Sequence, residues 1–192
     1  MRLQDMRLSL PGFVAAALAV AAVALGVWWV QKQAYRPESL AWQFIERDVR
    51  THYPDVPTIS TDRLGAWLAD DARRAPVLLD AREPDEYAVS HLPGAVRVDP
   101  DAGVDALLTS VLRDAAGRPV VVYCSVGLRS GGVAQRLTRA GVGEVYNLEG
   151  SIFRWANERR PLVRGAEAVR EVHPYNLTWG RLVRPAYRAD VD

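Results

Sequence analysis

The chain has 192 residues, enough for one domain with a hydrophobic core and further segments at its ends. Its 24 basic and 23 acidic residues leave a formal net charge of +1, which provides no electrostatic basis for binding nucleic acid. A single cysteine, Cys124, excludes an internal disulfide and a metal cage built from cysteines. The histidines at positions 52, 91 and 173 are far apart and lack the spacing of metal ligands, so we expect no metal.

An uncharged apolar run occupies residues 11–30, after a short tail over residues 1–10. A helix of this length is about 30 Å long and matches the hydrocarbon core of a bilayer. Trp28 and Trp29 lie at its end, where indole rings favour the membrane interface. The run therefore predicts a single-pass transmembrane anchor over 11–30, with a membrane protein as a further candidate partner. A cleaved signal peptide is the alternative, because small residues near its end resemble a cleavage site.

The orientation of this predicted anchor is not decided by charge, because basic residues follow the run as well as precede it. A short N-terminal tail most simply remains inside, and long domains cross membranes largely regardless of their charge. We therefore expect the domain on the outer, extracytoplasmic side.

Residues 31–56 predict a polar linker followed by a helix. The buried face of that helix is predicted from apolar residues at helical spacing: Leu40, Phe44 and Ile45. A second helix is expected over 61–70, capped by Ser60 or Thr61.

Beyond residue 75, short apolar strands alternate with helices. The strands are predicted over 76–80, 95–98, 119–123 and 142–148. The helices are predicted over 83–90, 104–115, 130–141 and 151–160. This alternation indicates an α/β domain around a central, mostly parallel sheet flanked by helices.

Two chemically active residues directly follow or end strands of this predicted sheet. Asp80 ends the strand over 76–80, and Cys124 follows the strand over 119–123. In parallel sheets, ligands collect outside the carboxyl ends of the strands. We therefore expect both residues at the same edge of the sheet, with Asp80 and Arg82 supporting the site rather than reacting.

The segment that follows Cys124 has the features of an anion-binding loop. It is short, and it contains Gly127, a residue type that tolerates dihedral angles other residues avoid. Backbone N–H groups can converge in such a loop, and the next helix adds further donors and the positive end of its dipole. Arg129 adds a permanent positive charge. These groups are predicted to lower the pKa of the Cys124 thiol and so to make it a nucleophile. The alternative is that Cys124 is a small buried apolar residue.

Three segments resemble the rhodanese domain, the thiosulfate-sulfurtransferase-like superfamily. They are residues 78–98, "LLDAREPDEYAVSHLPGAVRV"; residues 120–130, "VVVYCSVGLRS"; and residues 145–163, "VYNLEGSIFRWANERRPLV". The resemblance implies a rhodanese-like domain over 57–163. Residues 164–192 lie outside it, and we expect this extension to pack on the domain, because exposed Trp and Tyr side chains are unfavourable. Contact of this basic, aromatic stretch with lipid headgroups or a partner is the alternative. The residues at the family's active-loop positions are Cys124, Ser125, Val126, Gly127, Leu128, Arg129 and Ser130. Those at its supporting positions are Asp80, Arg82, Glu86 and His91.

The resemblance implies a transfer of sulfur in two steps. The Cys124 thiolate would attack the outer sulfur of a donor such as thiosulfate, and sulfite would leave. The persulfide on Cys124 would then pass its sulfur to a thiol or to cyanide. Backbone N–H groups of residues 125–130 would surround the terminal sulfur, and no metal or organic cofactor is required.

Two other functions compete with this one. Cysteine phosphatases and arsenate reductases use C-x5-R spacing, whereas Cys124 and Arg129 form C-x4-R, a shorter loop that suits one sulfur better than a phosphate. A non-catalytic rhodanese-like module that binds a partner or carries a persulfide at the membrane is the second alternative. The chain also departs from the family pattern at Ser125, where many members carry a basic residue, which weakens its attraction for anionic thiosulfate.

Overall fold

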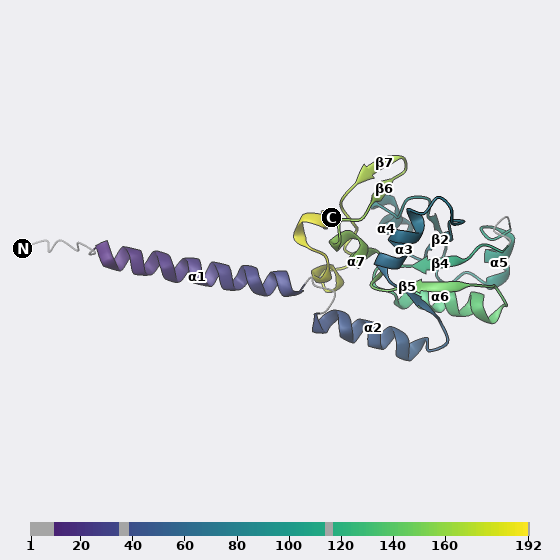
Figure 1. The fold of residues 1–192 in the computed structure, drawn as a ribbon, viewed down its shortest axis with the longest axis horizontal. Coiled ribbons are helices and arrows are strands. Elements are labelled where there is room, and N and C mark those ends of the chain that lie inside the picture. Colours follow the sequence, from purple (N-terminus) through teal and green to yellow (C-terminus); the bar gives the residue numbers. More distant parts are fainter. Residues whose placement is uncertain (1–9, 35–38, 114–116, 192) are drawn as a thin grey trace, which may run out of the picture.

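The computed structural model describes residues 10–34, 39–113 and 117–191. Its centre is a parallel sheet of five strands in the order β1-β5-β4-β2-β3 (Figure 1). The strands are β1 (Thr58–Ile59), β2 (Val77–Asp80), β3 (Val96–Arg97), β4 (Val120–Tyr123) and β5 (Val145–Leu148). A separate antiparallel pair is formed by β6 (Leu162–Arg164) and β7 (Glu167–Val169). The predicted α/β fold with a central parallel sheet is therefore confirmed.

Helices cover both faces of the sheet. They are α2 (Leu40–His52), α3 (Thr61–Leu68), α4 (Pro84–Val89), α5 (Val104–Thr109), α6 (Leu128–Arg139) and α7 (Ser151–Asn157). The first helix, α1 (Leu10–Ala34), does not lie on the sheet (Figure 1). Two short 3-10 helices, η1 (Trp179–Leu182) and η2 (Pro185–Tyr187), lie near the C-terminus. The helix predicted over 104–115 ends at Thr109, and residues 114–116 lie outside the described residues.

The central strand β4 divides the core into two clusters because successive side chains of a strand point to opposite faces. Val121 and Tyr123 join the cluster that contains residues of α2, α3 and α7. Val120 and Val122 join the cluster that contains residues of α5 and α6. A strand that is buried on both faces has a continuous apolar sequence, as "VVVY" has here.

The predicted buried face of α2 is wrong. Leu40 and Phe44 are 83% and 73% exposed, whereas Trp42, Ile45 and Val49 are buried. These three residues also form a stripe at helical spacing, and the large indole of Trp42 gains more from burial than a leucine. Ile45 is the one residue shared by the predicted and the observed faces.

The predicted membrane anchor over residues 11–30 is not supported. Among the residues that the structure describes, none of the helices combines the length and the apolar character needed to cross a bilayer. Figure 1 shows α1 extending away from the α/β domain.

The C-terminal segment returns to the domain after β7. Val172 and Val183 are fully buried in the same core cluster as α7, and Val172 pairs with Arg188 in an isolated β-bridge.

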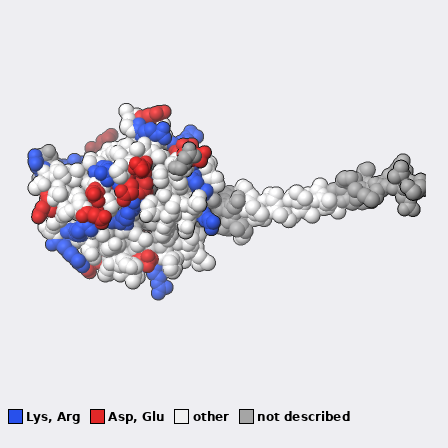
Figure 2. All heavy atoms as spheres, turned by 180° about the vertical axis from the view of Figure 1, so that it is seen from behind, with Lys and Arg blue, Asp and Glu red and all other residues white. Residues whose placement is uncertain are grey.

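Figure 2 shows basic and acidic side chains intermingled on one face of the domain, with the described part of α1 free of both.

Candidate active site

Cys124 lies at the carboxyl edge of the parallel sheet, directly after β4. The register of the sheet pairs Tyr123 with Asp80, so the ends of β4 and β2 meet at this edge. Cys124 is 2% exposed, and the backbone N–H of Gly127 donates a hydrogen bond of 3.1 Å to its Sγ. The sulfur therefore lies in the apolar core cluster that contains residues of α6, and it accepts a hydrogen bond from a peptide N–H.

The loop that follows Cys124 turns at Gly127 into α6. Gly127 has φ +115°, a conformation that residues with a side chain rarely adopt, and it is the N-cap of α6. Residues 128–130 form the first turn of α6, so their N–H groups have no carbonyl partner within the helix. Short spacing between Cys124 and the helix thus places the N–H of Gly127 and the positive end of the helix dipole beside the sulfur.

Glu86 of α4 accepts hydrogen bonds from two residues that follow Cys124. Arg129 donates hydrogen bonds of 2.7 and 2.9 Å to its two carboxylate oxygens. Ser125 donates a hydrogen bond of 2.7 Å to Oε1 and accepts one of 2.9 Å from Arg129. The guanidinium of Arg129 is therefore paired with the Glu86 carboxylate.

The environment of this pair keeps both groups charged. Burial, the largest effect, raises the pKa of Glu86, but the hydrogen bonds from Arg129 and Ser125 more than offset it, so the pKa is lowered from its ordinary 4.5. Burial lowers the pKa of Arg129, but the hydrogen bonds to Glu86 and the charges of Cys124 and Glu86 raise it overall. The site thus contains a buried carboxylate and a guanidinium that neutralise each other.

Two positioning residues were missed by the sequence analysis. Asn147 of β5 donates to the carbonyl of Gly127 at 2.9 Å and accepts from the Ser130 hydroxyl at 2.7 Å. Ser151 accepts a hydrogen bond of 3.2 Å from the backbone N–H of Cys124. The available signal for Asn147 was a polar residue inside an apolar strand, because a buried amide needs partners.

Asp80 and Arg82 form a separate buried pair. Arg82 donates to both carboxylate oxygens of Asp80, at 2.9 and 2.7 Å, and to the carbonyl of Ser90 at 2.6 Å. Both side chains are fully buried. This pair connects the end of β2 to the segment after α4.

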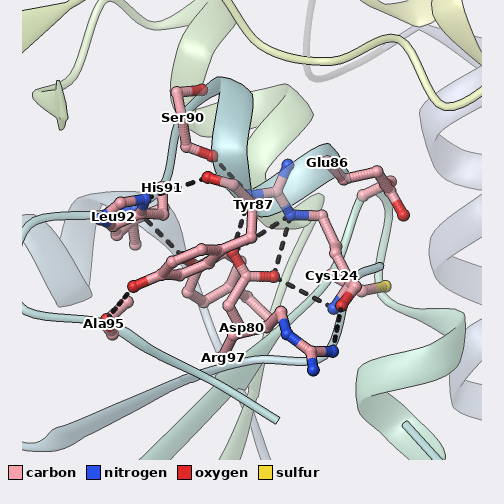
Figure 3. Close-up of polar contacts among 12 residues, drawn as sticks. Asp80, Glu86, Tyr87, Ser90, His91, Leu92, Ala95, Arg97 and Cys124 are labelled. Carbon is pink, nitrogen blue, oxygen red and sulfur yellow. Dashed lines mark hydrogen bonds and ion pairs between the residues drawn. The ribbon is translucent and has the colours of Figure 1, made fainter. Parts of the chain in front are cut away.

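His91 belongs to the far side of this polar cluster. Its ring stacks on Tyr87 with centroids 3.9 Å apart, and its backbone pairs with Val163 of β6. In Figure 3, His91 and Tyr87 lie away from the sulfur of Cys124, whereas Glu86 lies on the same side as Cys124. The structure therefore brings Glu86 to the reactive loop but not His91.

A cavity of about 130 Å³ opens over the reactive cysteine. It is lined by Cys124, Ser125, Val126, Leu128, Arg129, Tyr175 and Trp179. The last two residues come from the C-terminal segment, and Arg129 lies with its guanidinium carbon 4.7 Å from the centre of the Tyr175 ring. Among the residues that the structure describes, we find no cluster of three or more His, Cys, Asp or Glu side chains that could bind a metal ion.

A family model described as a rhodanese-like domain matches residues 61–158, just over half of the chain. The chain belongs to the rhodanese-like domain family. The match includes α4, the Cys124 loop, Asn147 and all of α7. Family membership therefore covers every residue of the site except the two aromatic residues of the C-terminal segment.

Known proteins resemble parts of the chain. A tRNA uridine(34) hydroxylase of Burkholderia ambifaria is 34% identical over 108 residues, which cover 54% of this chain and 38% of the relative. The BH2092 protein of Bacillus halodurans has a TM-score of 0.52 at 18% identity, with 69% of this chain and 95% of that chain covered, and shares the fold. A thiosulfate sulfurtransferase of Pseudomonas aeruginosa has a TM-score of 0.49 at 29% identity, with 66% and 23% covered. The match thus spans less than two fifths of the curated relative's own length.

Proposed function

We propose that this rhodanese-like protein is a sulfurtransferase that moves a sulfane sulfur through a persulfide on Cys124. The proposal is carried by one observation, the peptide N–H of Gly127 held 3.1 Å from Sγ at the first turn of α6. Such donors stabilise a thiolate, which is the nucleophilic form, and they also stabilise the terminal sulfur of a persulfide. The substrates would be a small donor such as thiosulfate and an acceptor thiol or cyanide.

The reaction would proceed in two displacement steps. In the first, the Cys124 thiolate attacks the outer sulfur of thiosulfate, a new S–S bond forms, and sulfite leaves with the electron pair of the broken bond. In the second, cyanide or a thiolate attacks the outer sulfur of the persulfide, and the Cys124 thiolate is released. When cyanide is the acceptor, neither of the two steps requires a proton, an oxidant or a cofactor.

The contacts of Arg129 argue against a phosphatase or an arsenate reductase. A site that cleaves a tetrahedral oxyanion needs an arginine whose N–H groups bind the oxygens. Here three of the five N–H groups of Arg129 are bound by Glu86 and Ser125, and the Glu86 carboxylate compensates its charge. The compact loop, with four residues between Cys124 and Arg129, fits a single sulfur atom.

Incubation of the full chain with thiosulfate and cyanide tests the proposal. We expect thiocyanate over many turnovers, and we expect mass spectrometry to detect one added sulfur on Cys124 when cyanide is omitted. The Cys124→Ser variant should form neither product. One sulfur per chain without turnover would indicate the alternative, a persulfide carrier. Sulfur on the Cys124→Ser variant would refute the assigned nucleophile, and hydrolysis of a phosphate ester would favour the phosphatase.

A further inference from the structure

The walls of the cavity over Cys124 are mainly hydrocarbon. Val126 and Leu128 of the loop form one side, and Tyr175 and Trp179 of the C-terminal segment form the other. The aromatic side is contributed by a segment outside the matched family region. This lining is therefore a property of this chain rather than of the family core.

The C-terminal segment is held in place by its own buried contacts. Val172 and Val183 anchor it in the core on both sides of the aromatic pair. The amide of Asn157 donates to the carbonyl of residue 182 and accepts from the N–H of residue 184. The backbone N–H of Tyr175 donates to Nδ1 of His173, and Tyr175 has φ +65°, an unfavourable conformation for a tyrosine. A strained residue persists only where surrounding contacts impose it, so the ring of Tyr175 occupies a defined position.

The positive charge of Arg129 in the cavity is compensated by a neighbouring carboxylate. Among the described residues that line it, the one cationic side chain is Arg129, and the Glu86 carboxylate compensates its charge through two hydrogen bonds. The ring of Tyr175 covers one face of its guanidinium. The nearby carboxylates of Glu83 and Glu86 and the Cys124 thiolate outnumber this cation. A second negative charge on a substrate would therefore meet no uncompensated cation among these residues.

We propose that this cavity selects sulfane-sulfur donors that carry one negative charge and an apolar group, R–SO2–S⁻ or R–S–S⁻, over the thiosulfate dianion. The inference rests on the proposed sulfur transfer and names the substrate class for the same site. Moving a dianion from water into an apolar cavity without a free cation is costly. An apolar group R instead gains free energy by contact with Tyr175 and Trp179.

The chemistry of loading is the same for each donor. With a thiosulfonate, the Cys124 thiolate attacks the terminal sulfur, the S–S bond to the sulfonyl group breaks, and a sulfinate R–SO2⁻ leaves with the electron pair. With an organic persulfide, a thiolate R–S⁻ leaves in the same way. In both cases two negative charges enter and two leave, so no further reactant is needed.

Three donors separate the effects of charge and of the apolar group. The full chain is loaded with thiosulfate, methanethiosulfonate or benzenethiosulfonate, and the rate of sulfur addition to Cys124 is followed by mass spectrometry. Each rate is divided by the rate of the same donor with a small free thiol, which removes differences in intrinsic reactivity. We expect both thiosulfonates to exceed thiosulfate, and benzenethiosulfonate to exceed methanethiosulfonate by about tenfold, as about 1.4 kcal/mol of aromatic contact implies.

The Tyr175→Ala variant tests the aromatic wall, with Leu177→Ala as its matched control. Leu177 lies in the same segment but is 92% exposed and does not line the cavity. Tyr175→Ala should reduce the preference for benzenethiosulfonate over methanethiosulfonate by about threefold to tenfold, while Leu177→Ala should leave it unchanged. If Tyr175→Ala does not fold, as judged by circular dichroism, the order of the three donors with the wild-type chain decides the question.

The outcomes distinguish this inference from the proposed function. Efficient loading by thiosulfate, equal to that by benzenethiosulfonate, would overturn the selectivity and leave the sulfurtransferase intact. An unchanged phenyl-to-methyl preference in a folded Tyr175→Ala variant would also overturn it. Loading of Cys124 by none of the three donors would overturn both.

Discussion

Glu86 and Arg129 are joined by two hydrogen bonds, 2.7 and 2.9 Å long, although 43 positions separate them in the chain. Glu86 belongs to α4 and Arg129 to the first turn of α6, so the pair connects two helices across the carboxyl edge of the sheet. Ser125, the residue after the reactive cysteine, donates to the same carboxylate. The shape of the reactive loop therefore depends on a buried charge pair, and this dependence can be measured.

Glu86→Gln removes the negative partner while keeping the size of the side chain. Breaking a fully buried ion pair costs about 3–5 kcal/mol, and the 23% exposure of the Arg129 side chain reduces the expected loss of unfolding free energy to about 2–3 kcal/mol. Glu83→Gln is the matched control, because Glu83 lies 3.7 Å from Arg129 but its side chain is 56% exposed. Denaturation by urea measures both variants. An equal small effect of the two substitutions would show that the buried pair does not stabilise the domain.

Acid should weaken the same contact in the wild-type chain. The pKa of Glu86 is lower in the folded protein than its ordinary 4.5, so the unfolded chain binds a proton first as the pH falls. The contribution of Glu86 is therefore fully present above about pH 4.5 and is lost as the pH falls through the folded pKa. Urea midpoints measured from neutral pH to pH 3 should fall more steeply for the wild-type chain than for Glu86→Gln. Parallel curves would contradict this assignment.

Local patterns were sufficient to predict the sheet, the position of Cys124 after β4 and the turn at Gly127. These features depend on neighbours in the sequence, namely an apolar run, a glycine and the start of a helix. The partner of Arg129 was not predictable in this way, because its identity depends on how α4 and α6 lie across the sheet. The same limit applies to Tyr175, whose place over Arg129 depends on the return of the C-terminal segment. The face of α2 was predicted wrongly because two apolar stripes overlap on that helix, and packing against the core selected the one with Trp42.

Two adjacent glycines of α6 should respond in opposite directions to alanine. A methyl group at Gly131 would lie 2.3 Å from a ring atom of Tyr53, so Gly131→Ala should lower the unfolding free energy by about 1–3 kcal/mol through overpacking. A methyl group at Gly132 would lie 3.4 Å from the Tyr53 hydroxyl, an ordinary contact. Gly132→Ala should therefore stabilise the helix by about 0.5–1 kcal/mol through higher helix propensity. Thermal or urea unfolding of the two variants decides the sign of each. Stabilisation by Gly131→Ala would mean that Tyr53 does not pack on α6 at this position.

Asn147 should control the rate of sulfur loading without touching the sulfur. Its amide N–H holds the carbonyl of Gly127, and the N–H of the same glycine points to Sγ of Cys124. Asn147→Ala releases this residue, and small displacements of a reactive group are costly, so we expect loading of Cys124 to slow by about tenfold. The Asn147→Ala substitution also leaves two buried polar groups unpaired, which should lower the unfolding free energy by about 2–3 kcal/mol.

Ser130→Ala is the comparison, because it removes only the hydroxyl that donates to Asn147 and keeps the contact between Asn147 and Gly127. Single-turnover loading, measured well below the unfolding transition, should therefore be much slower for Asn147→Ala than for Ser130→Ala. Equal loading rates for the two variants would remove Asn147 from the set of positioning residues and leave it a role in stability alone.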